Sequence, residues 1–315
     1  MKLTQLRMVL AIADKGSLRA AARELAITQP SLTHSLGELE RELGATLFER
    51  RARGMVPTPV GQVFLRRAAV IDSEARRARD EVAQFLGNDQ GEVMICLSVV
   101  AHLALLPMAL PLFQQRFPGV RLRIVEGAFP AVEARLRDGS VDFYLGAASD
   151  PPPSREFVVE KLFDNTRAVF ARHGHPLAGA RSLTELANVN WVTTGITDKA
   201  EAELRELFAK YQLPPPRLVL QSESMLTTLS TLMATDAMVI ALRQLDEFEP
   251  TRSALQRVPV QEVLPAPPVV VVRRAALPLA PAADYFCDMF RRAAAAYLSS
   301  LEAVCPGAAK SRVVL

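Results

Sequence analysis

The chain has 315 residues, of which 50% are hydrophobic and 23% charged, so it is long enough for two or three folded domains and is not a disordered chain. No apolar run reaches the roughly 18 residues that a membrane-spanning helix needs, and the N-terminus lacks a signal-peptide pattern, so we expect a cytoplasmic protein. Residues 1–60 hold nine Lys/Arg and six Asp/Glu and carry the whole formal excess of +3. This placement favours a phosphate-bearing partner at the N-terminal end.

The cysteines and histidines form none of the usual metal patterns. Cys96, Cys287 and Cys305 lie far apart in the sequence. His173 and His175 are two positions apart, without a third type of ligand beside them. The G-x-S-x-G turn, the phosphate-binding P-loop and the H-E-x-x-H helix are also missing from the sequence. We therefore expect no metal, no cofactor and no enzymatic activity.

The N-terminal segment predicts three short helices. The first ends at Gly16, and Ser17 and Thr28 are suitable N-caps for the next two. Pro30 falls in the first turn of the third helix, where a missing N–H costs nothing. Apolar residues recur at helical spacing in all three: Leu6, Val9, Leu10 and Ala13; Leu18, Ala21, Ala22 and Leu25; and Leu32, Leu36, Leu39 and Leu43.

The third helix has a mostly polar side opposite its leucines. At about 100° per residue, Pro30, Thr33, His34, Gly37 and Arg41 point away from the apolar stripe. A tight turn followed by such a helix is typical of a helix-turn-helix whose second helix reads DNA. An ordinary helical hairpin with a solvated outer face has the same spacing, so spacing alone leaves both interpretations open.

A basic hairpin and a long helix follow. Arg50, Arg51 and Arg53 precede a bend at Gly54, which predicts a wing that reaches the minor groove of DNA; a solvated charged loop is the alternative. Thr58 and the proline after it then begin a helix that should run to about Leu86, roughly 40 Å long. A small domain cannot bury the apolar stripe of such a helix, so we expect it to pair with its copy in a second subunit.

From residue 91 onward, strands alternate with helices, which predicts parallel sheets with right-handed crossovers. Strands are expected at 92–99, 120–126, 141–147, 157–163, 167–171, 191–194, 218–222, 238–242 and 269–273. Helices are expected at 107–117, 131–138, 199–211, 224–235 and 282–301.

These motifs, in this order, resemble the LysR-type transcriptional regulators over nearly the whole chain. The specific matches are residues 17–25 (SLRAAAREL), 28–32 (TQPSL), 39–44 (LERELG), 47–50 (LFER) and 58–61 (TPVG). Weaker matches are residues 117–120, 136–142 and 175–177. A finer resemblance, to the regulator of toluenesulfonate degradation, rests on residues 16–22 and on the pairs 273–274 and 277–278.

The resemblance implies a mixed fold with a winged helix-turn-helix at 1–58 and a dimerisation linker helix at 59–87. An α/β effector domain with two lobes, like a periplasmic binding protein, follows at 88–302, and a tail at 303–315. Lobe I would comprise 91–162 and 269–302, and lobe II 163–268, with chain crossings near 161–166 and 265–268. The implied partners are double-stranded promoter DNA, a small organic acid, further copies of the chain in a homodimer or homotetramer, and RNA polymerase, but no membrane. The regulator would act as an activator or a repressor.

The DNA contacts are expected from the helix-turn-helix and the wing. Gln29, Thr33 and His34 are the candidates for base edges, because glutamine pairs with adenine and the threonine methyl group contacts that of thymine. The remaining residues would contact phosphates or the minor groove. The full set is Ser17, Gln29, Pro30, Ser31, Thr33, His34, Arg50, Arg51 and Arg53.

The effector is expected at the carboxyl ends of the parallel strands, between the lobes. Near Ser98, Thr194 and Ser222 a strand leads to the start of a helix, and helix N-termini favour an anion. Phe129 and Phe143 are either walls of this cleft or core residues. The predicted effector-binding residues are Ser98, Val100, His102, Phe129, Gly146, Thr193, Thr194 and Ser222.

Overall fold

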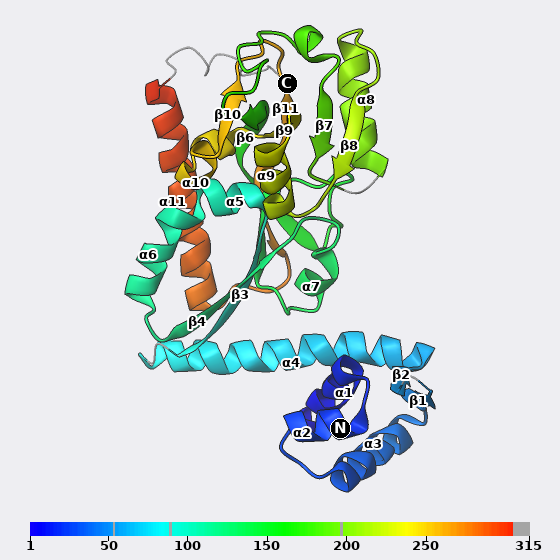
Figure 1. Cartoon of the computed structure of the whole chain (residues 1–315). Helices are drawn as coiled ribbons and strands as arrows, with labels where there is room; N and C mark the ends of the chain where they lie inside the picture. Colours follow the sequence, from blue (N-terminus) through cyan, green and yellow to red (C-terminus); the bar gives the residue numbers. More distant parts are fainter. Residues whose placement is uncertain (53, 88–89, 196–197, 305–315) are drawn as a thin grey trace.

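The computed structural model describes residues 1–52, 54–87, 90–195 and 198–304. It has three parts, which follow one another along the chain and in space: a small helical domain, one long helix and an α/β part with two lobes (Figure 1). The long helix α4 lies between the other two parts. In the described ranges, no helix combines the length and apolar character that a membrane crossing requires.

The N-terminal domain consists of three helices and a two-stranded ribbon. Its elements are α1 (Leu3–Lys15), α2 (Leu18–Glu24), α3 (Gln29–Leu43), β1 (Phe48–Arg51) and β2 (Gly54–Pro57). As predicted, the hydroxyl of Ser17 accepts a hydrogen bond from the backbone N–H of Ala20, and that of Thr28 from Ser31. The leucines of α3 pack into the core, except Leu43, which is 40% exposed. The prediction of a buried Leu43 was wrong, because Leu43 is the last residue of α3 and lies outside the core that Leu32, Leu36 and Leu39 join.

Helix α4 (Pro59–Phe85) begins against the N-terminal domain. The hydroxyl of Thr58 accepts a hydrogen bond from Gly61 and donates one to the carbonyl of Thr46, at 2.9 and 2.7 Å. Farther along, Arg7 of α1 pairs with Asp72 of α4 at 2.6 Å. Over its first half, α4 is therefore held by contacts with the N-terminal domain.

The α/β part is built on one continuous mixed sheet. The strand order is β4-β3-β5-β11-β6-β9-β7-β8, and β10 pairs with β6. The strands are β3 (Gly91–Leu97), β4 (Val120–Glu126), β5 (Phe143–Ala147), β6 (Phe157–Arg172), β7 (Asn190–Thr193), β8 (Arg217–Gln221), β9 (Ala237–Leu242), β10 (Leu255–Val258) and β11 (Pro265–Arg274). β3 is parallel to β4 and β5, and β7 to β8 and β9, but β6 and β11 are antiparallel to their neighbours. The parallel strands within each lobe agree with the predicted parallel sheets, but the antiparallel β6 and β11 that join them were not predicted.

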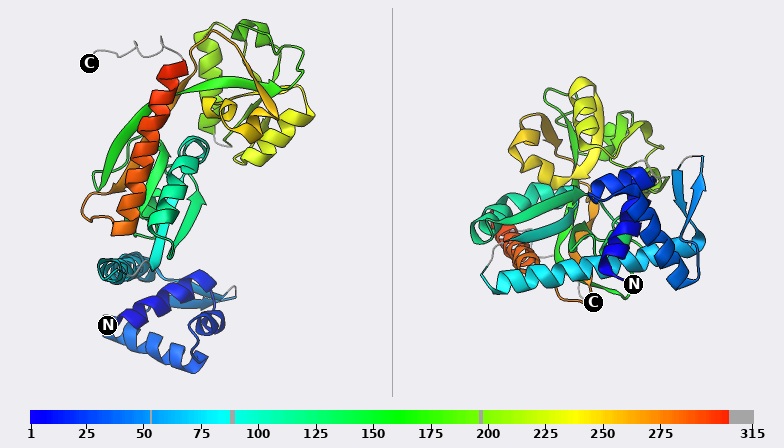
Figure 2. Two further views of the ribbon diagram at one scale, coloured as in Figure 1. Left: turned by 90° about the vertical axis from the view of Figure 1, so that its left-hand side faces the viewer. Right: turned by 90° about the horizontal axis from the view of Figure 1, so that it is seen from below.

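Strands β6 and β11 run through both halves of this part. The sequence predicted two strands at 157–163 and 167–171, but β6 is continuous, because Asn165 and Thr166 stay paired with Ala266 and Pro265 of β11. We call the half around β3, β4 and β5 lobe I, and the half around β7, β8, β9 and β10 lobe II. Figure 2 shows the two lobes side by side in its left view, with lobe II farther from α4.

Each lobe has its own core. In lobe I, α5 (Val99–Ala104), α6 (Leu106–Arg116) and α11 (Pro281–Val304) cover the sheet, and Phe143 is fully buried against Phe286 and Phe290. Phe143 is therefore a core residue and not a cleft wall. In lobe II, Trp191 packs edge-on against Phe208. The other helices are α7 (Glu133–Arg137), η1 (Leu183–Leu186), α8 (Asp198–Lys210), α9 (Met225–Ala234), η2 (Arg243–Asp246) and α10 (Glu249–Arg252).

Candidate DNA-binding surface and effector site

The outer face of α3 is free of the protein's own core. Gln29, Pro30, Ser31, Thr33 and His34 are all exposed, while Leu32, Leu36 and Leu39 on the opposite side are buried. Thr33 donates its hydroxyl proton to the carbonyl of Gln29 at 2.9 Å, and the His34 imidazole lies 3.2 Å from the Glu38 carboxylate. A rigid helix thus presents amide, hydroxyl and imidazole groups together on one side.

The ribbon β1–β2 is fixed to the end of α1. The backbone N–H of Met55 donates to the carbonyl of Gly16 at 2.8 Å, and Gly54, with a φ of 115°, lies against the same carbonyl. Arg50 and Arg51 are exposed on β1, and Arg51 pairs with Glu49 at 2.9 Å. Arg53, the third predicted wing residue, lies outside the described residues. Ser17 is half-buried, and its hydroxyl already serves as the cap of α2.

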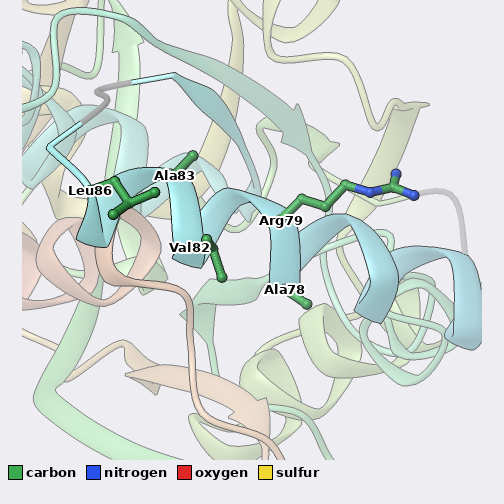
Figure 3. A pocket seen from close by; sticks show the side chains of 5 residues that line it. All are labelled: Ala78, Arg79, Val82, Ala83 and Leu86. Carbon is green, nitrogen blue, oxygen red and sulfur yellow. The ribbon is translucent and has the colours of Figure 1, made fainter.

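The second half of α4 leaves apolar side chains in solvent. Phe85 and Leu86 are 90% and 78% exposed. Next to them a depression of about 520 Å³ is lined entirely by this helix and its C-cap, through Ala78, Arg79, Val82, Ala83 and Leu86 (Figure 3). An apolar helix face of this kind has the character of a surface that a second helix covers.

In lobe I, three of the predicted effector residues lie in one place. Ser98 is the N-terminal cap residue of α5, and its hydroxyl is buried with no hydrogen-bond partner among the described residues. A side chain at Gly146 would meet both this hydroxyl and that of Tyr144. His102, one turn into α5, has its Nδ1 3.1 Å from the carbonyl of Ser98. An orphaned hydroxyl at a glycine-lined helix start is suited to bind a polar ligand group.

The side chains of the two other lobe I candidates, Val100 and Phe129, do not contact the Ser98 hydroxyl directly. Val100 is fully buried in the lobe I core, so any contact that it makes with a ligand would be through its backbone. Phe129 is half-buried and packs edge-on against Tyr144, with the ring centroids 5.1 Å apart. Phe129 thus reaches the Ser98 region through Tyr144.

The lobe II candidates form a second group. The backbone N–H of Ser222 donates to the carbonyl of Thr193 at 3.1 Å, which holds the ends of β7 and β8 together. Thr193 donates its hydroxyl proton to Gly195, and Ser222 accepts one hydrogen bond from the N–H of Ser224. Thr194 is exposed. The hydroxyls of Thr193 and Ser222 therefore already have internal partners, unlike that of Ser98.

Helix α5 connects the two lobes. It begins at Ser98 in lobe I, and its Leu103 packs against the lobe II core around Leu232 and Leu245. A polar cluster lies at the same junction: the Gln244 amide donates to Asn165 of β6 and to the Tyr297 hydroxyl of α11, both at 2.9 Å. The Tyr297 hydroxyl in turn donates to Glu247 at 2.7 Å. The two lobes are thus joined by α5 and by this polar cluster.

Sequence reasoning missed Tyr144 and Arg77. Tyr144 lies beside Ser98 and Gly146, and its hydroxyl donates to the carbonyl of Ala147 at 3.0 Å; burial raises the pKa of this hydroxyl, which stays neutral. Its position two residues before Gly146 on a strand was the signal for it, since alternate strand residues share a face. Arg77 is buried although it belongs to the charged helix α4, and nothing in the helical pattern distinguishes it from Arg76 or Arg79.

The geometry defines a class of protein: a winged helix-turn-helix joined by a long helix to an α/β domain with two lobes. The family model for the bacterial regulatory helix-turn-helix protein of the LysR family matches residues 3–62, and that for the LysR substrate binding domain matches residues 86–295. The chain belongs to the LysR family of DNA-binding transcriptional regulators, which is regulatory and not enzymatic.

Individual relatives agree with this assignment. The chain is 28% identical to the transcriptional regulator GbpR of Azospirillum brasilense, over 80% of this chain and 75% of that protein. It is 33% identical to the RuBisCO operon transcriptional regulator of Allochromatium vinosum, over 60% of this chain and 63% of that protein.

Solved structures show the same fold. Full-length CbnR complexed with its target DNA has a TM-score of 0.69 at 20% identity, over 93% of this chain and all of that one. Full-length BenM has a TM-score of 0.53 at 21% identity, over 94% of this chain and 97% of that one. The finer resemblance to the toluenesulfonate regulator stays a prediction.

Proposed function

We propose that this regulator reads promoter DNA with the exposed face of α3 and responds to a small organic anion bound between its lobes. The observation that carries the first half is the placement of Gln29, Thr33 and His34 on the free side of a helix whose other side is held by buried leucines. Such a helix enters the major groove as a rigid body, so its side chains meet base edges in a fixed register. Its working place is the cytoplasm, where promoter DNA is available.

The wing supplies the contacts that do not depend on sequence. Arg50 is exposed and makes no ion pair with Glu49, whereas Arg51 does. We infer that Arg50 contacts phosphates or the minor groove directly, together with Arg53, and that Pro30, Ser31 and Ser17 approach the backbone at the start of the two helices.

Two DNA-binding heads, each made of the helix-turn-helix and the wing of one subunit, would act together. The reason is that a second α4 helix would bury the exposed apolar side chains of the first. Val82, Phe85 and Leu86 are exposed along the end of the helix, and a second copy of the same helix would bury them. We propose a homodimer through α4 that assembles further to a homotetramer. Contact with RNA polymerase would follow from binding at a promoter.

The effector site is argued from Ser98. Its buried, unpartnered hydroxyl at the start of α5, with Gly146 leaving room beside it, favours a ligand oxygen at that point. We propose a carboxylate or sulfonate, with His102 and the neutral Tyr144 hydroxyl as neighbouring polar groups and Thr193, Thr194 and Ser222 facing it from lobe II. The lobe boundaries at 162/163 and 268/269 belong to this proposal.

The response would be a population shift between lobe angles. Because α5 begins at the site and packs by Leu103 into lobe II, a ligand at Ser98 favours one arrangement of the lobes. The ligand must bind that arrangement better than the other, or nothing changes. The altered lobe angle would then change the spacing of the DNA-binding heads and the bend of the DNA.

A gel-shift titration with the protein's own upstream region tests the DNA-binding half. We expect a specific complex that outlasts non-specific competitor DNA, and a relaxed sequence preference in both Gln29→Ala and His34→Ala. An unchanged preference in both variants would remove these residues from the base-reading set.

A thermal-shift screen tests the effector half. We expect at least one carboxylate or sulfonate to raise the melting temperature of the full chain, and Ser98→Ala to abolish that rise. If no anion has an effect, the proposed helix-terminus site is wrong.

A further inference from the structure

The side of α4 opposite its exposed apolar residues carries a buried charge cluster. Arg77 and Asp142 have side chains that are only 8% and 4% exposed, and their closest atoms are 2.8 Å apart. The guanidinium of Arg77 donates through both Nε and Nη2 to the same oxygen of Asp142 and also to the carbonyl of Gly139. Every side of this guanidinium is thus held by lobe I or by Glu74 of its own helix.

Asp142 also connects the cluster to strand β3 of lobe I. The other carboxylate oxygen of Asp142 accepts a hydrogen bond from the backbone N–H of Met94 in β3 at 2.8 Å. β3 leads from Met94 directly to Ser98, the candidate effector residue. Asp142 therefore connects the linker helix to the strand that ends at the proposed site.

A second arm reaches the strand that passes between the lobes. The Oε1 atom of Glu74 accepts hydrogen bonds from the guanidinium groups of Arg77 and Arg274, each at 2.6 Å. Arg274 is the last residue of β11. β11 runs back from there through lobe I and pairs with β6 as far as Thr166. The strand that crosses the lobes therefore ends on the linker helix.

Close backbone approach completes the junction. The Ser73 hydroxyl donates to the carbonyl of Asp138 at 3.1 Å, and Gly139 leaves no room for a side chain beside it. Near the end of the helix, the Gln84 amide oxygen accepts a hydrogen bond from the N–H of Ala282 at 3.0 Å. The tethers span three turns of α4, so they restrain rotation of the helix as well as its separation from lobe I.

We propose that Glu74, Arg77, Asp142 and Arg274 form a coupling junction that fixes the linker helix and lobe I as one rigid unit. Lobe II is then the part that moves, and a change in the lobe angle turns lobe I, α4 and the DNA-binding head together relative to lobe II. The consequence for DNA rests on the proposed function, but the rigid unit itself does not. A buried charge pair suits this task, because loss of either partner leaves the other uncompensated and the geometry has no neutral alternative.

The test uses the full chain without DNA. Arg77→Met removes the central charge, and Arg67→Met makes the same substitution at an exposed position of the same helix. We expect both variants to keep the helical circular-dichroism signal. Small-angle scattering of Arg77→Met should show a larger radius of gyration, and hydrogen exchange should accelerate in segments 70–77 and 138–142 but not in 190–193. Arg67→Met should match the wild type in both measurements.

Arg274→Gln keeps the experiment decisive if Arg77→Met does not fold, since it leaves the Arg77–Asp142 pair in place. It should give the same changes in scattering and exchange with smaller amplitude. Scattering and exchange profiles of the folded junction variants that superimpose on those of Arg67→Met would overturn the proposal. A changed scattering profile in a protein that ignores DNA would instead refute the proposed function and leave the junction standing.

Discussion

Gly61, in the first turn of α4, lies directly against the backbone of Leu47. A Cβ at position 61 would stand 2.0 Å from the carbonyl oxygen of Leu47, and that oxygen also accepts a hydrogen bond from the N–H of Thr58 at 2.9 Å. Only glycine allows the helix and the segment before the wing to meet this closely. The direction of α4 relative to α3 depends on this contact.

Gly61→Ala should therefore destabilise the N-terminal domain, by about 1–3 kcal/mol, because backbone atoms and not a flexible side chain must give way. Calorimetry of the full chain measures this as a lower unfolding temperature. A variant as stable as the wild type would show that the backbone at Leu47 can move aside for a Cβ at position 61 without cost.

Gly37→Ala is the matched control, with its own expected result. Gly37 lies in the middle of α3 with open space where a Cβ would project. Alanine should raise the free energy of unfolding by about 0.5–1 kcal/mol through helix propensity alone. If the same variant loses affinity for DNA while gaining stability, the duplex approaches the helix at this position.

Arg50 and Arg51 of the wing should contribute differently to DNA binding. Arg50→Ala should weaken binding to all duplex sequences and reduce the salt dependence by about one phosphate contact. Arg51→Ala should have a smaller effect, since Arg51 already pairs with Glu49. Titrations at several salt concentrations measure both slopes, and equal slopes for Arg50→Ala and the wild type would rule out a phosphate contact by Arg50.

Alkaline pH should destabilise the fold through its buried thiols. Burial raises the pKa of Cys96 from 9.0 to about 11 and that of Cys287 from 9.0 to about 12. The unfolded chain therefore ionises first, and the stability contributed by protonated thiols is complete below pH 9 and lost as the pH rises toward 11–12.

Cys287→Ala isolates one of these groups. It should reduce the slope of unfolding free energy against pH by up to about 1.4 kcal/mol per pH unit in this window. Denaturant titrations at several pH values measure the slope. An identical slope in the variant would show that the Cys287 thiol does not contribute to the linkage.

The helices and strands with a strong local pattern were predictable, and those set by distant partners were not. The caps Ser17, Thr28 and Thr58 lie where expected, because their signals are local to each helix. The polar residues 164–166 looked like an interruption, but pairing with a strand about a hundred positions away keeps β6 continuous. The short helix α5 was missed because its residues, 99–104, continue the apolar run of β3.

The candidate sites show the same division. The exposed face of α3 could be predicted from helical periodicity alone. At about 100° per residue, the leucine spacing determines which residues lie on the opposite side of the helix. Val100 shows the limit: it belongs to the same helix start as Ser98, but its side chain turns into the lobe I core. The contacts of Arg77 with Asp142 and of Arg274 with Glu74 could not be foreseen, because they form only when α4 packs against segments of lobe I that are far away in the sequence.

A DNase footprint of the full chain on its own upstream region tests the central claim most directly, that two α3 helices held by paired α4 helices grip one duplex. We expect two protected half-sites on one face of the DNA, separated by about 10 base pairs or a multiple of it. Val82→Lys, which places a charge in the apolar face of α4, should lose the paired protection. Val263→Lys, which changes another exposed valine, in lobe II, should keep it. A single isolated protected segment, or no protection at low salt, would contradict the account.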